Sequence, residues 1–374
     1  MVDLWDHQRK AIELAREQND LALFMGMGTG KTRTQIEILR EEYTKHGKLL
    51  RTLIIGPAAV VPNWKVEFAK YSKINPKDIH ILDGSLAERA ATLRTCDGIF
   101  ITNFEACAFP KFTEALYDRP PNILIIDESH RIKESSAKRT KALIKLTHLM
   151  EEMPIKRRFI LTGSPVLNTE MDLFSQFLVL DAGATFGTNF FSFRGTYFRD
   201  ANEFMPKQKH FPNFKPRPGA LEAIKQKIEP KVFRADKSQC LDLPPLLRME
   251  IAVELSPAQK KAYEDMKKEF IAFVNPDMPP AIANLALTKA LRMQQIVSGF
   301  LNLEGGEVHR FKDNHRANVL SDLLEDITPN EKVIVWSVFH EDHDIVKAIL
   351  KNLNIDYAEV TGLVKDKQSE LKRF

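Results

Sequence analysis

The sequence predicts an α/β protein whose first lobe is a parallel sheet with helices on both faces. Short apolar runs recur through the first half of the chain, and they are continuous rather than alternating. Such runs are typical of strands buried on both faces of a parallel sheet. The stretches between them, such as Arg33–Tyr43 and Arg131–Met150, have apolar residues at helical spacing. This alternation predicts a doubly wound domain over residues 1–180. The runs are Leu21–Met25, Thr52–Gly56, Ile79–Leu82, Gly98–Thr102, Asn122–Ile126 and Arg158–Thr162.

The remainder of the chain changes character twice. Residues 186–217 hold nine Phe or Tyr without a clear period, and residues 220–300 look mostly helical. We therefore assign 181–315 to a largely helical insertion or connector. From about 316 the α/β pattern resumes, with helices expected at Ala317–Ile327 and Asp342–Leu353 and strands at Lys332–Trp336 and Ile355–Val360. Residues 316–374 thus read as the start of a second α/β lobe, which remains incomplete.

Length and composition exclude several classes of protein. The 374 residues exceed the roughly 250–300 at which one hydrophobic core stops growing, so at least two domains are expected. Three scattered cysteines without a C-x-x-C pair exclude a disulfide scaffold or a cysteine zinc site and fit a reducing cytosol. No apolar run approaches the ~18 residues needed to span a bilayer. We expect a cytoplasmic monomer that does not bind membranes, from a bacterial or phage-infected cell.

The strongest motif is a glycine-rich loop that follows the first predicted strand. Residues 25–32 read M-G-M-G-T-G-K-T, where glycines let backbone N–H groups and the next helix N-terminus face phosphate oxygens. Lys31 would reach the β- and γ-phosphates, and the Thr32 hydroxyl would ligate Mg²⁺. The strict pattern has Gly where this chain has Met25. The loop predicts an ATP site formed by Met27, Gly28, Thr29, Gly30, Lys31 and Thr32.

An acidic pair ends a later strand. Asp127 and Glu128 follow four apolar residues, Ile123–Ile126, at the strand end where α/β folds place ligands. We expect Asp127 to hold Mg²⁺ directly or through water and Glu128 to polarise the attacking water, with Lys31 as the third catalytic residue. Upstream, Gln8 lies on a short amphipathic helix, and its amide could pair with an adenine edge.

These residues resemble superfamily 2 helicases. The motifs are Gln8, Gly28–Thr32, Asp127–His130 and Leu161–Pro165, in that order. More narrowly the chain is similar to the Swi/Snf-type ATPases that translocate on duplex DNA. Supporting segments are Ile54–Pro57 with Asn63-Trp64 (motif Ia), Ile101–Glu105 (motif Ib), Val232–Lys237 with Leu243-Pro244, Leu291–Gln295, and Val333–Ser337 (motif IV).

The resemblance implies a RecA-like P-loop lobe and further site residues. Thr162, Gly163 and Ser164 belong to the family's motif III, which couples the nucleotide site to the nucleic-acid track. In motifs Ia and Ib, Pro57, Asn63, Thr102 and Asn103 follow strands, where backbone N–H groups and short polar side chains can meet phosphates. Such contacts are independent of base sequence. Trp64 is expected to be packed core rather than a base-stacking platform.

One part of the family pattern has no match. Motifs V and VI should follow Gly362, and no Q-x-x-x-R-x-x-R sequence occurs after position 337. Motif VI carries the arginine finger, which contributes about 10³–10⁵ in rate. We therefore expect a truncated second lobe and very slow hydrolysis by these 374 residues.

A basic segment adds a second nucleic-acid candidate. Residues 205–218 read MPKQKHFPNFKPRP, without an acid, and could follow phosphates or serve only as a solvated connector. Three functions remain open. The first is a duplex-DNA translocase, the second an RNA or single-strand helicase of the same superfamily, and the third a module that binds ATP and DNA without turnover. The basic residues are Lys207, Lys209, Lys215 and Arg217.

Overall fold

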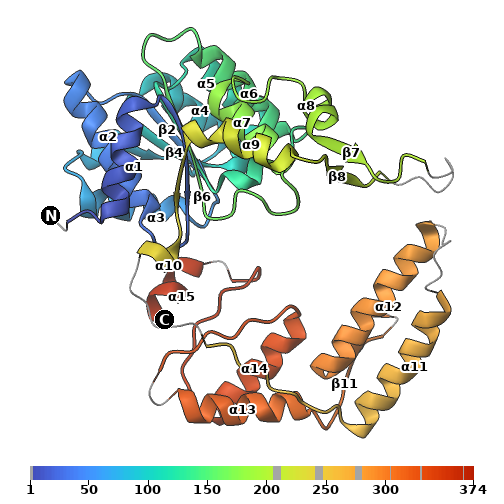
Figure 1. Ribbon diagram of the computed structural model, residues 1–374. Helices are drawn as coiled ribbons and strands as arrows, with labels where there is room; N and C mark the ends of the chain where they lie inside the picture. Colours follow the sequence, from blue (N-terminus) through green and yellow to red (C-terminus); the bar gives the residue numbers. More distant parts are fainter. Residues whose placement is uncertain are drawn as a thin grey trace. The chain divides into compact units, whose positions relative to one another are not determined.

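The protein, seen here in a computed structural model, divides into two compact units (Figure 1). The structure describes residues 3–204, 212–240, 247–273, 280–303, 305–328, 331–364 and 366–374. The first unit is Met1–Pro245 and the second is Leu246–Phe374. Residues 181–240, which we assigned to a connector, therefore pack with the first unit as far as they are described.

The first unit is built on a seven-stranded sheet in the order β3-β4-β2-β5-β6-β1-β9. All neighbouring strands are parallel, which confirms the predicted fold class and all six predicted strands. The sequence did not reveal β9, because it is short and one of its side chains, Arg234, is exposed. The strands are β1 (Asp20–Met25), β2 (Thr52–Gly56), β3 (Ile79–Ile81), β4 (Ile99–Asn103), β5 (Ile123–Asp127), β6 (Arg157–Thr162) and β9 (Val232–Ala235).

Alternate side chains of each strand enter two separate cores. Leu21, Leu23 and Met25 of β1 face one core, whereas Ala22 and Phe24 face the other. Helices α1 (Asp6–Glu17), α2 (Lys31–His46) and α3 (Val61–Tyr71) cover the first face. The opposite face carries α4 (Leu86–Thr95), α5 (Pro110–Asp118), α6 (Lys138–Met150), α7 (Asp172–Asp181), α8 (Phe190–Tyr197) and α9 (Ala220–Ile228) (Figure 1).

An aromatic cluster explains the segment without a period. Phe186, Phe193 and Tyr197 lie with ring centroids 4.9–6.2 Å apart, and Phe193 also meets Phe174 of α7 at 5.2 Å. These rings pack around α8 as a cluster rather than along one helical stripe, so their spacing in sequence shows no regular repeat. The chain then forms a small antiparallel pair, β7 (Phe198–Asp200) with β8 (Phe214–Pro216).

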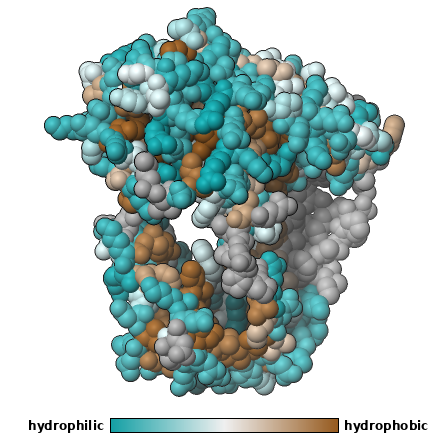
Figure 2. Space-filling view, turned by 60° about the vertical axis from the view of Figure 1, so that its left-hand side comes forward, coloured by the Kyte–Doolittle hydropathy of each residue, from teal (hydrophilic) through white to brown (hydrophobic). Residues whose placement is uncertain are grey.

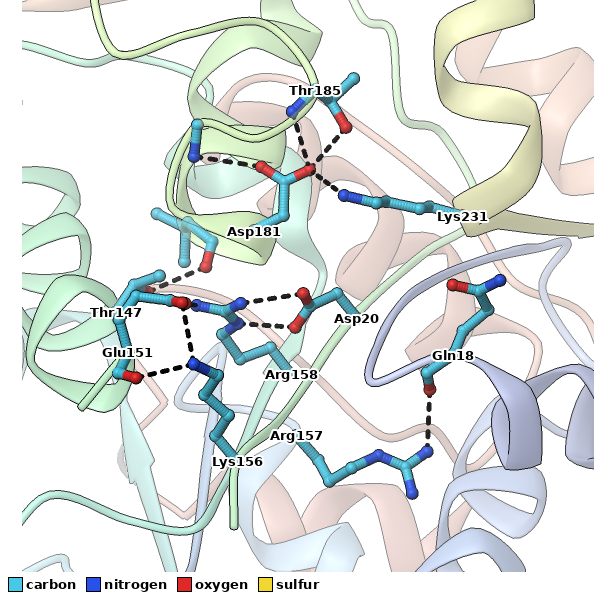
Figure 3. A network of polar contacts seen from close by, with 12 residues as sticks. Gln18, Asp20, Thr147, Glu151, Lys156, Arg157, Arg158, Asp181, Thr185 and Lys231 are labelled. Carbon is cyan, nitrogen blue, oxygen red and sulfur yellow. Dashed lines mark hydrogen bonds and ion pairs between the residues drawn. The ribbon is translucent and has the colours of Figure 1, made fainter. Parts of the chain in front are cut away.

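Ion pairs lock the amino ends of the central strands (Figure 3). Asp20 is directly opposite Arg158 in the β1–β6 register, and the guanidinium donates to both carboxylate oxygens, at 2.7 and 2.8 Å. The adjacent Arg157 donates to the Gln18 carbonyl at 3.0 Å and pairs with buried Glu42 of α2. Because a slip of one residue would break these pairs and turn each side chain to the other face, they fix the register.

The second unit is mainly helical among its described residues. It comprises α11 (Pro257–Phe273), α12 (Pro280–Ser298), a β10 (Phe300–Asn302)–β11 (Val308–Arg310) hairpin, α13 (His315–Ile327), α14 (His340–Asn352) and α15 (Lys367–Arg373). Helices α13 and α14 confirm the two helices predicted there. Leu324, Ile349 and Leu350 form a small core between them.

The two strands predicted in this unit are wrong. Residues 332–336 and 355–360 form no strand in the described structure, because a strand exists only where its N–H and C=O groups pair with a neighbour. Apolar side chains of the first segment are consequently exposed, with Trp336 at 87%. Figure 2 shows hydrophobic residues at the surface of this unit, in the lower part of the view. Of the helices described, none has the length and hydropathy to cross a membrane.

The buried ion pair of Asp181 allows a prediction about the stability of the first unit. Its side chain is fully buried and accepts from Lys231 Nζ at 2.7 Å and from the backbone N–H groups of Gly183 and Thr185 (Figure 3). Asp181→Ala leaves these donors unpaired, so we expect the free energy of unfolding in urea to fall by about 3 kcal/mol. Asp118→Ala removes an exposed partner of Arg94 and should cost less than about 1 kcal/mol. Equal losses would contradict the assignment.

Candidate nucleotide and metal site

The glycine-rich loop has the backbone shape that its sequence predicts. It connects the end of β1 at Met25 to the start of α2 at Lys31. Gly28 and Gly30 have φ angles of 78° and 81°, in the left-handed region where a side chain is strained. The N-terminus of a sixteen-residue helix therefore opens directly from the loop, which is a favourable arrangement for phosphate oxygens.

The ammonium group of Lys31 is folded back over the loop. Its Nζ donates to the carbonyl oxygens of Met25 at 2.9 Å and Gly26 at 3.3 Å. Thr32 is half-buried in the first turn of α2, whereas the Met27 side chain is 77% exposed. The lysine thus already lies at the loop, and its present partners are neutral oxygens that an anion could replace.

Helix α1 is tied to the same loop by its first residues. Gln8 is buried, donates from Nε2 to the Gly30 carbonyl at 3.3 Å and accepts from the Trp5 N–H at 2.9 Å. His7 Nε2 lies 2.8 Å from the Thr29 carbonyl. The Gln8 amide keeps one further N–H and one further lone pair, so its pairing with an adenine edge stays a prediction.

Asp127 is the last residue of β5 and is 6% exposed. Oδ2 accepts from the indole Nε1 of Trp64 at 3.0 Å, and Oδ1 accepts from the Glu128 N–H at 3.0 Å. Burial raises the pKa of this carboxyl group, while the Trp64 hydrogen bond and the charge of Lys31 act to lower it. The site therefore holds a carboxylate whose charge is only partly compensated.

Glu128 occupies a strained backbone position next to a hydroxyl and an imidazole. Its φ is 53° and its ψ is 55°, which is uncommon for a residue with a side chain. Thr162 Oγ1 lies 3.4 Å from Glu128 Oε2, and His130 Nδ1 lies 3.3 Å from that oxygen and 3.1 Å from the hydroxyl. Burial lowers the pKa of His130 despite the neighbouring glutamate. These contacts fix the direction of the Glu128 side chain.

The predicted coupling residues lie beside this group. The Ser164 N–H donates to the Thr162 hydroxyl at 3.1 Å. A Cβ added at Gly163 would lie 3.4 Å from the Met25 carbonyl and 3.6 Å from the Met27 nitrogen. The loop after β6 therefore packs against the phosphate loop as well as against Glu128. The structure brings Thr162, Gly163 and Ser164 to the nucleotide site, and their coupling role stays a prediction.

Three contributors to the site were not foreseen. Trp64 was predicted to be core and is, at 1% exposed, but its hydrogen bond to Asp127 was not expected. Gln176 of α7 accepts from Ser129 Oγ and donates to the Pro165 carbonyl, both at 2.7 Å. Lys237 follows β9, and its Cε would lie 4.0 Å from a Cβ at Gly28. Trp64 and Lys237 carried a sequence signal, as parts of the Asn63-Trp64 and Val232–Lys237 motifs, whereas Gln176 carried none.

The donor set fits magnesium. Mg²⁺ prefers oxygen ligands and is usually held by one or two carboxylates together with substrate phosphates. Asp127 and the Thr32 hydroxyl offer such oxygens beside the phosphate loop. Within the described ranges, no group of three or more His, Cys, Asp or Glu could hold a metal ion.

The residues predicted to contact nucleic acid differ in exposure and in their hydrogen bonds. Asn63 of α3 is exposed, and the half-buried Asn103 accepts at Oδ1 from the Ala106 N–H at 3.2 Å. Pro57 and Thr102 are buried, so only their backbone neighbourhood could meet a phosphate. Exposed Lys215 lies on β8, while Arg217 donates from Nε to the carbonyls of Gly195 and Phe198. Lys207 and Lys209 lie outside the described residues.

Comparisons with known proteins identify the family of the chain. A family model described as SNF2-related domain matches residues 7–305. An ATP-dependent helicase of Mycoplasma genitalium is 27% identical over 93% of this chain and 31% of its own length. Putative protein p41 of Acyrthosiphon pisum secondary endosymbiont phage 1 is 26% identical over 89% of this chain and 72% of its own. The chain thus spans about a third of the first relative.

A solved structure shows the same fold. The Sulfolobus solfataricus SWI2/SNF2 ATPase core in complex with dsDNA aligns with a TM-score of 0.50 and 21% identity. The alignment covers 99% of this chain and 75% of that one. The likeness supports a RecA-like α/β architecture for the first unit.

We predict that the ionised Asp127 carboxylate lowers the stability of the folded protein in the absence of ligands. Because its pKa is raised in the folded state, stability is lost as the pH rises through that value and the carboxylate ionises. Asparagine mimics the neutral carboxyl group. Asp127→Asn should therefore unfold at a higher urea concentration than the native chain at pH 7 in EDTA. The difference should narrow toward about pH 4, near the unfolded pKa.

The control for this measurement is Asp118→Asn, which changes an exposed carboxylate of α5. Its stability at pH 7 should stay within about 1 kcal/mol of that of the native chain. A lower stability of Asp127→Asn at pH 7, or a difference that is constant with pH, would contradict the assignment.

Proposed function

We propose that this chain, which belongs to the SNF2-related domain family, is an ATP-dependent motor that tracks on duplex DNA. The observation that carries the proposal is the meeting of three loops at one edge of the sheet. The phosphate loop after β1, the Asp127-Glu128 pair after β5 and Thr162–Ser164 after β6 lie in contact there. That combination would supply phosphate binding, a metal ligand and a base beside one another.

The proposed nucleotide chemistry uses groups that are already in position. Lys31 would exchange the Met25 and Gly26 carbonyls for phosphate oxygens, since a charged acceptor makes a stronger hydrogen bond than a neutral one. Thr32 and Asp127 would hold Mg²⁺, which neutralises phosphate charge when bound. Gln8 would meet the adenine, and the backbone of residues 27–30 would surround the phosphates.

Glu128 would orient and polarise the attacking water. Its carboxylate is 25% exposed and is aimed by Thr162 and His130, so it can reach water while its direction stays fixed. Holding a reactant in the productive orientation is a large part of catalysis in phosphoryl transfer. Through its hydrogen bond to Thr162, Ser164 would couple the position of Glu128 to the loop that leads to α7.

The DNA part of the proposal rests on position and on relatives. The loops after β2 and β4 start at the same sheet edge as the proposed nucleotide site. Asn63 lies in α3, which follows the first loop, and Asn103 is the last residue of β4. Lys215 adds an exposed positive charge on β8. The related Sulfolobus core was solved with double-stranded DNA. RNA or single-strand helicase activity, and binding without turnover, are the alternatives. Very slow hydrolysis by these 374 residues stays a prediction.

Lys31→Ala tests the nucleotide site. Loss of one charge-assisted hydrogen bond, worth roughly 1.5–3 kcal/mol, should weaken labelled ATP binding at least about tenfold. The unfolding midpoint should change little, because the half-buried Lys31 side chain contacts only backbone carbonyls of the loop in the hydrogen bonds described. Lys45→Ala removes an exposed lysine from the same helix and serves as the matched control. Unchanged affinity in Lys31→Ala would mean that the phosphate site is elsewhere.

A gel-shift series tests the partner. Duplex DNA, single-stranded DNA and RNA of equal length are compared at one salt concentration, with and without an ATP analogue. We expect duplex DNA to bind most tightly, with affinity that falls as salt rises. Lys215→Glu should weaken every duplex sequence alike. Tighter binding of RNA or single strands would support an RNA or single-strand helicase. DNA binding without DNA-stimulated phosphate release would support a module that binds ATP and DNA without turnover.

A further inference from the structure

Helix α3 presents neighbouring residues to two different surroundings. Asn63 is exposed on its first turn, whereas Trp64 is 1% exposed and lies against the sheet. One turn later, Phe68 is fully buried, with its ring centroid 6.0 Å from that of Trp64. The helix begins after a turn in which the Val60 and Val61 N–H groups donate to the Pro57 carbonyl. A displacement of the Asn63 side of the helix therefore also displaces Trp64.

The Trp64 indole reaches the carboxylate that the proposed function assigns to magnesium. Nε1 donates to Asp127 Oδ2 at 3.0 Å, between side chains that are 63 positions apart. An indole is only a donor, so it favours an oxygen that carries lone pairs. Oδ1 is held from the other side by the Glu128 N–H. Two donors together restrict rotation of the carboxylate and leave one lone pair on each oxygen for other ligands.

The end of β2 closes around the same carboxylate. A Cβ added at Gly56 would lie 3.4 Å from Asp127 Cβ and 4.0 Å from Oδ2. Gly56 immediately precedes the Pro57 turn that starts α3. The Asp127 side chain is therefore surrounded by the β2–α3 segment on one side and by its own loop on the other. The β2–α3 segment therefore connects helix α3 to the surroundings of the Asp127 carboxylate.

We propose that Trp64 is a positioning residue that links helix α3 to Asp127 and sets how this carboxylate is presented to magnesium bound with ATP. The inference rests on the proposed function, because it takes Asp127 as the metal ligand and the exposed side of α3 as part of the DNA track. In this arrangement, DNA held at Asn63 adjusts the nucleotide site through one indole N–H. The simpler role, in which Trp64 only fills the core, is the alternative that the test must separate.

Trp64→Phe tests the link, since phenylalanine keeps most of the ring packing and removes the N–H. Affinity for a non-hydrolysable ATP analogue is measured in Mg²⁺ and in EDTA. We expect affinity in EDTA to be unchanged and affinity in Mg²⁺ to fall about tenfold, as for loss of one hydrogen bond to a charged group. The Mg²⁺ concentration that gives half-maximal binding of the analogue should also change less on addition of duplex DNA in Trp64→Phe than in the native chain.

Phe68→Leu is the matched control, because it disturbs the same aromatic packing without touching Asp127. It should lower the unfolding midpoint and keep the native ratio of affinities in Mg²⁺ and EDTA. The proposal would be overturned if Trp64→Phe kept the native ratio of affinities in Mg²⁺ and EDTA. It would also be overturned if Phe68→Leu lowered that ratio as much as Trp64→Phe does. If Trp64→Phe is too unstable to purify, Trp64→His retains a ring N–H. A ratio closer to native than that of Trp64→Leu, which removes the N–H, supports the link, and equal ratios in the two variants overturn it.

Failure of the proposed function gives a different result. If the native chain binds the analogue no better than Lys31→Ala does, the nucleotide site itself is misassigned. If the native chain binds the analogue, requires Lys31 and gains affinity from Mg²⁺, the site stands. An unchanged ratio in Trp64→Phe then rejects only the link.

Discussion

The parallel pairing of β1 with β6 and of β6 with β5 is the constraint on which the site depends. In this register Phe24 faces Thr162 and Asp127 faces Leu161, so the phosphate loop, the acidic pair and the Thr162 loop start at one edge. A slip of one residue would separate them and would turn every buried side chain to the wrong face. At the opposite edge, the Asp20–Arg158 pair fixes the same register. The site is therefore positioned by contacts made about a strand length away.

The two edges of the sheet treat charge in opposite ways. At the amino edge, Arg157 and Arg158 are buried beside carboxylates, so their charges are satisfied within the protein. At the carboxyl edge, Lys31 donates only to carbonyl groups, and Asp127 accepts from neutral N–H groups. Burial without a direct counter-ion costs free energy. In the proposed function, a nucleotide with its metal would supply charges of both signs, so the features that reduce the stability of the protein alone would favour binding.

Local patterns explain most of what the sequence predicted, and non-local contacts explain what it did not. The six strands were visible because each is a continuous apolar run, and the loop was visible because Gly28 and Gly30 precede Lys31. Strand β9 was missed because only its pairing with β1 makes it a strand. The segment 332–336 has a strand-like sequence but no pairing partner among the described residues. The bond from Trp64 to Asp127 joins positions 63 residues apart, a distance at which no periodicity operates.

That bond also bears on how a rigid fold can transmit a signal. The sheet itself is tightly packed, and close-packed interiors change by discrete shifts of elements rather than by continuous deformation. Helix α3 is such an element, because a short turn at Pro57 connects it to β2 and Pro62 and Asn63 of its first turn are exposed. Its buried face carries a single polar link to Asp127. If the proposed DNA track includes the exposed side of α3, a shift of that helix would reach the Asp127 carboxylate through the indole N–H, which can only donate.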